Sequence, residues 1–362
     1  MRDGDVGPPV TASTLHGVTT DFSDSGASAT PDSGNRPGAS SEQVGDDRPG
    51  ARTFATLFDA ITSNIAQVIH GKDTAIELAV IALLAEGHLL VEDVPGVGKT
   101  SLAKALSASV DCTWKRVQFT PDLLPTDLVG VSIYQRSTET FRFDPGPLFA
   151  NILLADEINR ASPKTQSALL EAMEERQVTS DGVSRRLEPP FMVIATQNPV
   201  EQEGTYRLPE SQLDRFLLRI SIGYPGRNAE LQMLDEQGSA STIRQLSPVV
   251  SVEELQSMID AVKGVYMATA LKSYLVDLAE ASRRHPAIEL GLSPRATLQL
   301  ASASRAHAAA RGRNYATPDD VKAVGTAALA HRIVLRSDGG SQLHADEAID
   351  EVFAAVPVPV AR

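Results

Sequence analysis

A glycine-rich loop is the first feature of the sequence that could do chemistry. The run Asp93-Val94-Pro95-Gly96-Val97-Gly98-Lys99-Thr100 lies between an apolar stretch and a helical one. In such a loop, glycines let backbone N–H groups approach phosphate oxygens, the lysine reaches the terminal phosphates, and the hydroxyl can bind Mg²⁺. The sequence therefore predicts a P-loop. Asp93 stands where the general pattern has glycine, and its charge is unfavourable near phosphates unless it points away.

Two carboxylates follow a second apolar stretch. Ile152–Ala155 reads as a buried strand, and Asp156 and Glu157 come directly after it. Ligands bind at the carboxyl ends of strands in open α/β sheets. We expect Asp156 to hold Mg²⁺, directly or through water, and Glu157 to polarise the attacking water as a general base. The alternative is an ordinary solvated strand end, and the preceding P-loop favours the catalytic interpretation.

Asn198 and Arg215 are weaker candidates. Asn198 follows a third apolar stretch and could hold the nucleophilic water or touch the γ-phosphate, although Asn-Pro is also an ordinary turn dipeptide. Arg215 ends a short predicted helix, and a guanidinium suits the charge that develops on a phosphoryl group, in cis or from a neighbouring subunit. A local salt bridge of Arg215 with Asp214 or Glu210 is the alternative.

Arg295 is the last candidate. Ser293 is a predicted helix N-cap and Pro294 takes the first helical position, which puts Arg295 on the first turn of the helix. From there its side chain could swing onto nucleotide phosphates.

The elements that must position these residues alternate between strand and helix. Helices are predicted over residues 53–68, 72–85 and 100–109, and strands over 88–91, 114–119, 152–155 and 191–196. This alternation favours a parallel sheet covered on both faces, an α/β fold. From about residue 228 apolar residues recur only at helical spacing, over 228–238, 251–263, 268–284, 293–311 and 317–335. We therefore predict a small all-helical second domain.

Composition divides the chain further. Residues 1–51 are rich in Gly, Ser, Pro, Thr and Asp, and we predict a disordered tail there. The nucleotide-binding αβα core would cover 52–226, the helical domain 227–340, and a C-terminal tail 341–362. The tail at the N-terminus is either a dispensable extension or a regulatory segment.

Charge and cysteine content narrow the function. The formal net charge is −13 and the sequence pI about 5.0, which counts against nucleic acid as the default partner. Cys112 is the single cysteine, so no intramolecular disulfide is possible and nothing marks an oxidising compartment. The N-terminus lacks the features of a signal peptide, and the most apolar stretch, 75–91, is interrupted by Glu77, Glu86 and His88. We expect a cytoplasmic protein without a membrane-inserted segment.

These elements, in this order, resemble the AAA+ ATPases, and the stretches between them resemble the MoxR branch. The motifs that carry the resemblance are Gln118–Asp127, Gly146–Phe149, Asp156–Ala161, Thr196–Pro199, Glu203–Tyr206 and Leu208–Phe216. They lie within residues 53–336, most of the chain, and the run from Thr196 to Phe216 is specific. Asp93 departs from the glycine of the general pattern, which this branch tolerates, and Arg207 stands where proline is more usual.

The resemblance implies a P-loop αβα core with a helical lid, ATP and Mg²⁺ as cofactors, and a role for each candidate. Catalytic residues would be Glu157 of Walker B, Asn198 as sensor 1, Arg215 as an arginine finger acting in trans, and Arg295 as sensor 2. Nucleotide-binding residues would be Val68, Ile69, His70, Gly71, Pro95, Gly96, Val97, Gly98, Lys99, Thr100, Ser101 and Asp156. The metal would be held by Thr100 and Asp156.

The resemblance also implies a homo-oligomeric ring, usually a hexamer, with an insert over 131–145 and a hairpin over 176–190 pointing to its pore. Such proteins work as chaperones that remodel or mature a partner or insert a metal cofactor, often on a protein with a von Willebrand factor A domain. The alternatives are a nucleic-acid motor, to which Arg185 and Arg186 could contribute, a metal-chelatase-like ATPase subunit, and a non-hydrolysing scaffold. The scaffold would be marked by loss of Glu157 or Arg215, and both are present.

Overall fold

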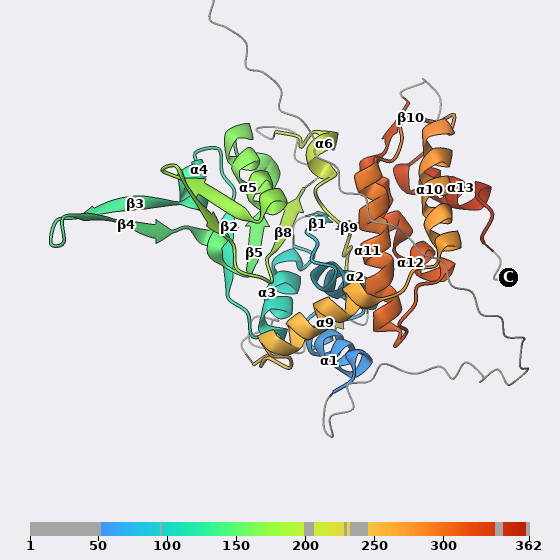
Figure 1. Cartoon of the computed structure of the whole chain (residues 1–362), viewed down its shortest axis with the longest axis horizontal. Helices are drawn as coiled ribbons and strands as arrows, with labels where there is room; N and C mark the ends of the chain where they lie inside the picture. The colour runs from blue at the N-terminus through green and yellow to red at the C-terminus, as the bar shows by residue number, and fades with distance from the viewer. Residues whose placement is uncertain are drawn as a thin grey trace, which may run out of the picture. The chain divides into compact units, whose positions relative to one another are not determined.

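The computed structural model describes residues 52–94, 96–198, 206–227, 230–231, 245–336 and 343–359 (Figure 1). Several sequence predictions lie outside these residues. They are the tail over 1–51, Pro95 of the P-loop, Pro199 and Glu203–Thr205 of the family motifs, and most of the helix over 228–238.

A parallel sheet forms the centre of the first half of the chain. Its strands lie in the order β2 (Trp114–Gln118), β5 (Ile152–Asp156), β8 (Met192–Gln197), β1 (Leu89–Glu92) and β9 (Leu218–Ile220). Every neighbouring pair is parallel, so all carboxyl ends meet at one edge, the carboxyl edge, and all amino ends at the other, the amino edge. The predicted α/β fold is confirmed, and β9 is the strand that sequence patterning missed.

Alternating side chains of the central strands enter two different apolar clusters. Leu89, Val91 and Ile194 pack with α1 (Phe54–Ala66), α2 (Asp73–Leu84) and α3 (Lys99–Ser109). Leu90 and Val193 face the opposite side, where α4 (Pro125–Val129) and α5 (Pro163–Glu175) lie. Burial on both faces explains why these strands are continuous apolar runs.

Two antiparallel hairpins extend from the α4–α5 side of the sheet. The first pairs β3 (Gly130–Gln135) with β4 (Thr140–Pro145), and the second pairs β6 (Gln177–Ser180) with β7 (Val183–Arg186). The first reaches well beyond the sheet (Figure 1) and exposes Tyr134 and Phe141. The hairpins touch through the Arg185 guanidinium, 3.8 Å above the Phe143 ring. Both agree in position with the predicted insert and hairpin.

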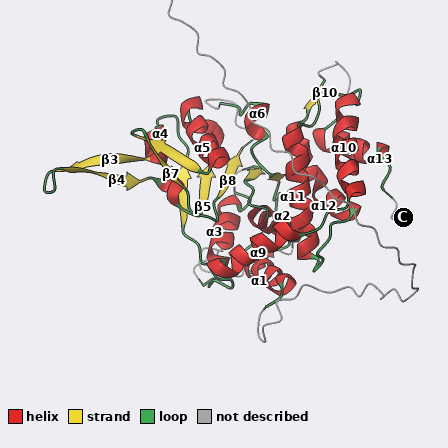
Figure 2. Cartoon of the chain, in the orientation of Figure 1, coloured by secondary structure: helices red, strands yellow, loops and turns green. Residues whose placement is uncertain are grey.

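Helices dominate the second half of the chain (Figure 2). They are α9 (Val252–Gly264), α10 (Thr269–Arg284), α11 (Pro294–Ala310) and α12 (Pro318–Leu329). The predicted helical unit is therefore confirmed, with one small addition: β10 (Ile288–Leu290) and β11 (Val334–Leu335) form a short antiparallel pair.

The core and the helical unit share one apolar cluster. Buried residues of α1–α3 and of α9–α12 belong to the same cluster, and Val249 N–H donates to the Ser109 carbonyl, 2.9 Å away. A boundary near residue 226 therefore separates the α/β part of the chain from the helical part, although the two parts share one hydrophobic cluster.

The segment assigned to a C-terminal tail contains a packed helix, and here the structure corrects the prediction. Helix α13 (Ala345–Ala355) begins with a capping box between His344 and Glu347 and buries Ala348, Ile349 and Val352. The apolar residues of α13 recur at helical spacing in the sequence, but only contact with α10 and α12 makes so short a helix stable.

Candidate active site

The P-loop joins the carboxyl end of β1 to the first turn of α3. Gly96 and Gly98 have φ values of 86° and 99°, a left-handed conformation that strains any residue with a Cβ. Lys99 Nζ donates to the Asp93 carbonyl at 2.5 Å and to the Gln197 carbonyl at 3.4 Å. The lysine amine therefore lies at the mouth of the loop, beside the N-terminus of α3, where backbone N–H groups suit an anion.

Asp93 points away from this loop, which resolves the difficulty its charge posed. Its Oδ2 accepts from Ser221 Oγ at 3.0 Å and from the N–H groups of Ile222 and Gly223 at 2.7 and 2.6 Å. Burial opposes the charge, but these bonds and that from the Val94 N–H outweigh it and hold the pKa of Asp93 below its ordinary value. Asp93 therefore fastens the loop to the chain leaving β9.

The Walker B carboxylates lie beside the loop. Asp156 is buried and accepts from Thr196 Oγ1 at 2.6 Å, while Thr100 Oγ1 lies 3.4 Å from its Oδ2. Glu157 has a left-handed φ of 57°, and its N–H donates to Thr196 Oγ1. The carboxylate and the hydroxyl are both oxygen ligands of the kind Mg²⁺ takes, so the residues fit the metal.

Three neighbours of these carboxylates were missed by sequence reasoning. Arg116 Nη2 lies 2.6 Å from Asp156, Gln118 Nε2 donates to Glu157 Oε2 at 2.7 Å, and Arg160 Nη1 pairs with Glu157 at 3.0 Å. Arg116 and Gln118 are two residues apart on β2 and so share a face, which is the signal that could have found them.

The remaining nucleotide-binding candidates surround the same place. Asn198 is buried directly after β8, and Val68 and Ile69 are buried before α2. Ile69 approaches the loop, since its Cδ1 would lie 3.8 Å from a Cβ added to Gly98. The structure therefore brings Ile69, the described P-loop residues, Asp156, Glu157 and Asn198 together at the carboxyl edge, but not Arg215 and Arg295.

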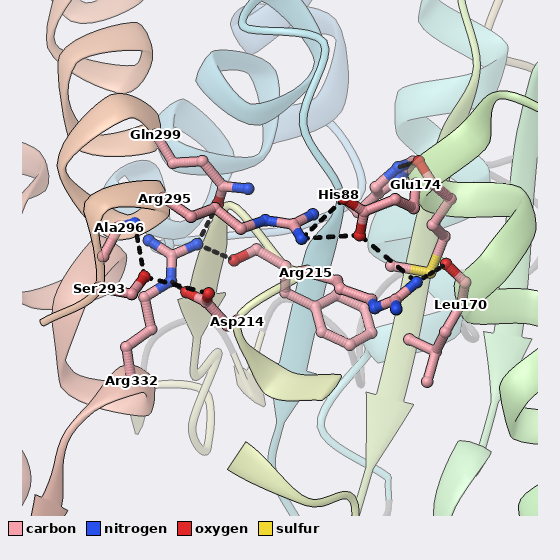
Figure 3. Close-up of polar contacts among 12 residues, drawn as sticks. His88, Leu170, Glu174, Asp214, Arg215, Ser293, Arg295, Ala296, Gln299 and Arg332 are labelled. Carbon is pink, nitrogen blue, oxygen red and sulfur yellow. Dashed lines mark hydrogen bonds and ion pairs between the residues drawn. The ribbon is translucent and has the colours of Figure 1, made fainter. Parts of the chain in front are cut away.

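Arg215 and Arg295 lie at the amino edge instead. Arg215 precedes β9, and its Nη1 donates to the Leu170 carbonyl at 2.6 Å and pairs with Glu174 at 3.4 Å. Arg295 begins α11 and pairs with the same Glu174 at 2.7 Å (Figure 3). The swing of Arg295 onto the phosphates of its own loop does not fit this placement.

Strand β1 measures the separation of the two edges. His88, just before β1, donates through Nε2 to the Met173 carbonyl, next to Glu174, and Asp93, just after β1, begins the loop. Five residues of extended strand span about 17 Å, so Glu174 and its two arginines are roughly that far from the loop.

A second ion pair joins the lid to the segment carrying Arg215. Arg332 is buried; its Nε lies 3.1 Å from Asp214, and its Nη2 donates to the Phe216 carbonyl and to Gln299 (Figure 3). Burial lowers the pKa of Arg332 to about 10, and Asp214 opposes that shift. Asp214 also accepts from Ser293 Oγ at 3.1 Å. The alternative interpretation paired Arg215 with Asp214 or Glu210, but the partners of Asp214 are Arg332 and Ser293.

His88 is a buried neutral imidazole at this edge. Its Nδ1 accepts from the Val193 N–H at 3.0 Å, so its Nε2 carries the proton that is donated to Met173. Burial lowers the pKa of His88 to about 3, and nearby Arg176 and Arg295 add to the shift. His88 therefore remains uncharged at neutral pH.

The described residues contain neither a cluster of metal-ligating side chains nor a helix suited to a membrane. Among them no three His, Cys, Asp or Glu side chains gather into a metal-binding group. None of the described helices combines the length and apolarity needed to cross a bilayer.

Comparison with known families and relatives gives a consistent result. Residues 88–218 match the model of the ATPase family associated with various cellular activities (AAA), and residues 280–352 match that of the AAA lid domain. The second match reaches through most of α13.

Named relatives cover most of the chain. The chain is 47% identical to the uncharacterised YeaC of Bacillus subtilis, in an alignment that covers 84% of this chain and 96% of YeaC. It is 40% identical to Chaperone MoxR1 of Mycobacterium tuberculosis, over 82% of this chain and 80% of that relative. It is 32% identical to Protein MoxR of Methylorubrum extorquens, over 86% of this chain and 99% of that relative. A crystal structure of a Cytophaga hutchinsonii protein superposes with a TM-score of 0.79 at 34% identity, covering 85% of this chain and 96% of that one.

Proposed function

The chain belongs to the MoxR family of AAA+ ATPases, and from that premise we propose that it hydrolyses ATP with Mg²⁺ in a ring of identical subunits. Each ATP would lie between the carboxyl edge of one subunit and the amino edge of the next. The ring drives chaperone work on a partner protein.

The residues at the carboxyl edge support the binding and water-activating half of this site. Backbone N–H groups of Gly96–Thr100 and the Lys99 amine would hold the phosphates, with the Val68–Gly71 segment beside the base. Thr100 and Asp156 would hold the magnesium ion, which when bound offsets phosphate charge. Glu157 would take the proton of the attacking water, and Asn198 would position that water.

The observation that carries the shared site is the position of Arg215. Its ion pair with Glu174 lies at the amino edge, about 17 Å from the loop by the length of β1. An arginine there is out of reach of its own ATP but can meet the ATP of a neighbour in a head-to-tail arrangement. Arg295 lies beside it, so we assign both arginines to the neighbouring site. A closed head-to-tail arrangement makes a ring, and six is the size we propose.

The partner is proposed from the relatives and from the hairpins. One relative is named a chaperone, and the β3–β4 hairpin exposes Tyr134 and Phe141, which suits contact with a protein. We propose a von Willebrand factor A domain protein as the client, matured or loaded with a metal cofactor. Arg185, which a nucleic-acid motor could use, is stacked on Phe143 within the chain.

The test is steady-state hydrolysis by the purified protein and its Glu157→Gln variant. Without the base, turnover should fall by about 10²- to 10⁴-fold while ATP still binds. Equal turnover in the two proteins would show that the assigned mechanism is wrong. A pull-down with the variant should retain the client, and stimulation by DNA in place of a protein would favour the nucleic-acid motor.

A further inference from the structure

Glu174 forms the centre of a three-residue cluster at the amino edge. Arg295 Nη1 donates to both of its carboxylate oxygens, at 2.9 and 2.7 Å, and Arg215 Nη1 lies 3.4 Å from Oε2 (Figure 3). The three side chains come from α5, from the segment before β9 and from the lid helix α11. One carboxylate therefore holds together two guanidinium groups from separate parts of the chain.

Helix stability does not account for a carboxylate at this position. Glu174 lies in the last turn of α5, where the partial negative charge of the helix end disfavours an acidic side chain by a few tenths of a kcal/mol. The same end favours cations, and the Arg215 and Arg295 guanidinium groups both lie there, paired with Glu174. The helix end therefore stabilises the two arginines but not the acid. The presence of Glu174 is explained by its ion pairs with Arg215 and Arg295.

The charges and exposure of the cluster suit arginines kept in place for an external anion. Two guanidinium groups this close repel each other, and Glu174 offsets that repulsion. Each of the three side chains keeps about a third of its surface exposed, Arg215 30%, Arg295 35% and Glu174 35%. The cluster is therefore fixed from behind yet open to an incoming charge.

The rest of the surroundings restrict movement of the cluster. On the lid side Ser293, the N-cap of α11, donates to Asp214 at 3.1 Å and accepts from the Ala296 N–H at 3.0 Å. On the core side Asp214 immediately precedes Arg215 and is paired with Arg332. Both arginine backbones are thus anchored. Glu174 sets where the Arg295 side chain points, and together with the Leu170 carbonyl it sets where the Arg215 side chain points.

We propose that Glu174 is a positioning residue that holds Arg215 and Arg295 as a pair aimed at the γ-phosphate of ATP on the neighbouring subunit. This inference rests on the shared site proposed above. Glu174 itself touches no nucleotide; it removes the need to order two long side chains as the phosphate charge develops. A misplacement of about 1 Å can cost about 10²-fold in rate, so loss of the clamp has a kinetic cost without loss of any reacting group.

The first experiment compares Glu174→Gln with Glu175→Gln. Both remove one negative charge from the same exposed helix turn, but Glu175 makes neither of the ion pairs with Arg215 and Arg295. We expect kcat to fall by about 10- to 100-fold in Glu174→Gln, with the Kd for ATP unchanged, and no change in Glu175→Gln. Glu174→Asp keeps the charge and should recover part of the rate. Unchanged kcat in Glu174→Gln, or a parallel loss of ATP binding, would overturn the proposal.

The second experiment tests that Glu174 acts across the interface. Subunits with Glu174→Gln keep Glu157, and subunits with Glu157→Gln keep the arginine cluster. In rings mixed in equal amounts about a quarter of the head-to-tail interfaces combine the two intact halves, so activity should rise above that of either variant alone. Absence of recovery would mean that Glu174 acts within its own subunit, contrary to the proposal.

Arg215→Ala separates the two levels of inference. If Arg215→Ala turns over ATP like the wild type, the shared site itself is wrong. If Arg215→Ala is inactive while Glu174→Gln is unaffected, the shared site stands and only the role of Glu174 fails.

Discussion

The two edges of the sheet carry different kinds of chemistry and are built in different ways. At the carboxyl edge the polar groups come from strand ends and from the loop that continues one of them: Asp156 ends β5, and Lys99 and Thr100 begin α3 after the loop that leaves β1. At the amino edge the polar groups come from a helix end, a loop and the lid, as Glu174, Arg215 and Arg295 do. The first edge is organised by local sequence and the second by tertiary packing.

Arg215→Ala is the change that should break this comparison most clearly. Loss of an arginine finger lowers kcat by about 10³-fold or more, and because Arg215 lies away from its own loop the affinity for ATP should not change. Steady-state turnover and direct nucleotide binding measure the two quantities. Arg215→Lys is the control: it keeps the charge, loses the forked geometry, and should remain poor. Weakened ATP binding in Arg215→Ala would place this arginine with the carboxyl-edge group.

Asp93→Ala tests how firmly the carboxyl edge is held. The substitution leaves the buried N–H groups of Ile222 and Gly223 without their charged acceptor, so the free energy of unfolding should fall by about 3 kcal/mol. Chemical denaturation measures it. Asp93→Asn keeps an acceptor oxygen and should cost less. Equal loss in both variants would mean that the charge, and not the bonded oxygen, is what stabilises the loop.

Acid should weaken the two edges in different pH ranges. The pKa of His88 is about 3 in the folded chain and near 6.5 when unfolded, so only the unfolded chain takes up a proton as the pH falls below 6.5. This stability is present above pH 6.5 and is lost towards pH 3, by about 2 kcal/mol between about pH 7 and about pH 5. Asp93 contributes its stability above its unfolded pKa, near 3.8, and loses it only in stronger acid.

Denaturation curves at several pH values check this difference. Burial also lowers the pKa of His331, so its contribution to stability is lost in acid in the same direction as that of His88. His331 lies at the same edge, since its Nε2 bonds the Phe216 carbonyl. A His88→Leu variant should therefore be less stable overall but lose less on acidification. An acid dependence unchanged in that variant would remove His88 from the explanation.

Ser293→Ala should have the smallest effect. It removes the N-cap of α11 and one bond to Asp214, and loss of a serine cap costs about 1 kcal/mol. Thermal unfolding measures the loss. Because Arg295 is on the same helix turn, turnover should fall slightly as well. Ser293→Thr should restore both the cap and the bond to Asp214. Lower stability with no change in turnover would mean that the Ser293 cap does not affect the function of Arg295.

Sequence reasoning succeeded where a motif and its scaffold are continuous in the chain. The P-loop, Asp156 and Glu157 were placed at one edge because strand, turn and helix signals follow one another there. The partners of Asp93 could not be foreseen, since Ser221–Gly223 lie about 130 residues further on and meet it only once β9 pairs with β1.

The amino edge was beyond sequence reasoning for the same physical reason. Glu174 appeared as one of several acids on an exposed helix, and nothing local connects it with Arg215 or Arg295. The position of Arg295 depends on how the lid docks, which the buried Arg332 and the shared apolar cluster determine. Helix α13 was read as a tail because prolines follow it, although its own spacing was helical.

The distance along β1 between the loop and the arginines has a consequence for how the reaction responds to dilution. Under the shared-site proposal a lone subunit carries half of each of two different sites and completes neither. Turnover per molecule would then fall steeply as the protein is diluted below the concentration at which subunits associate, with a reaction order in protein above one. A newly made or dissociated copy would be silent, able to hold ATP without consuming it until a second copy arrives.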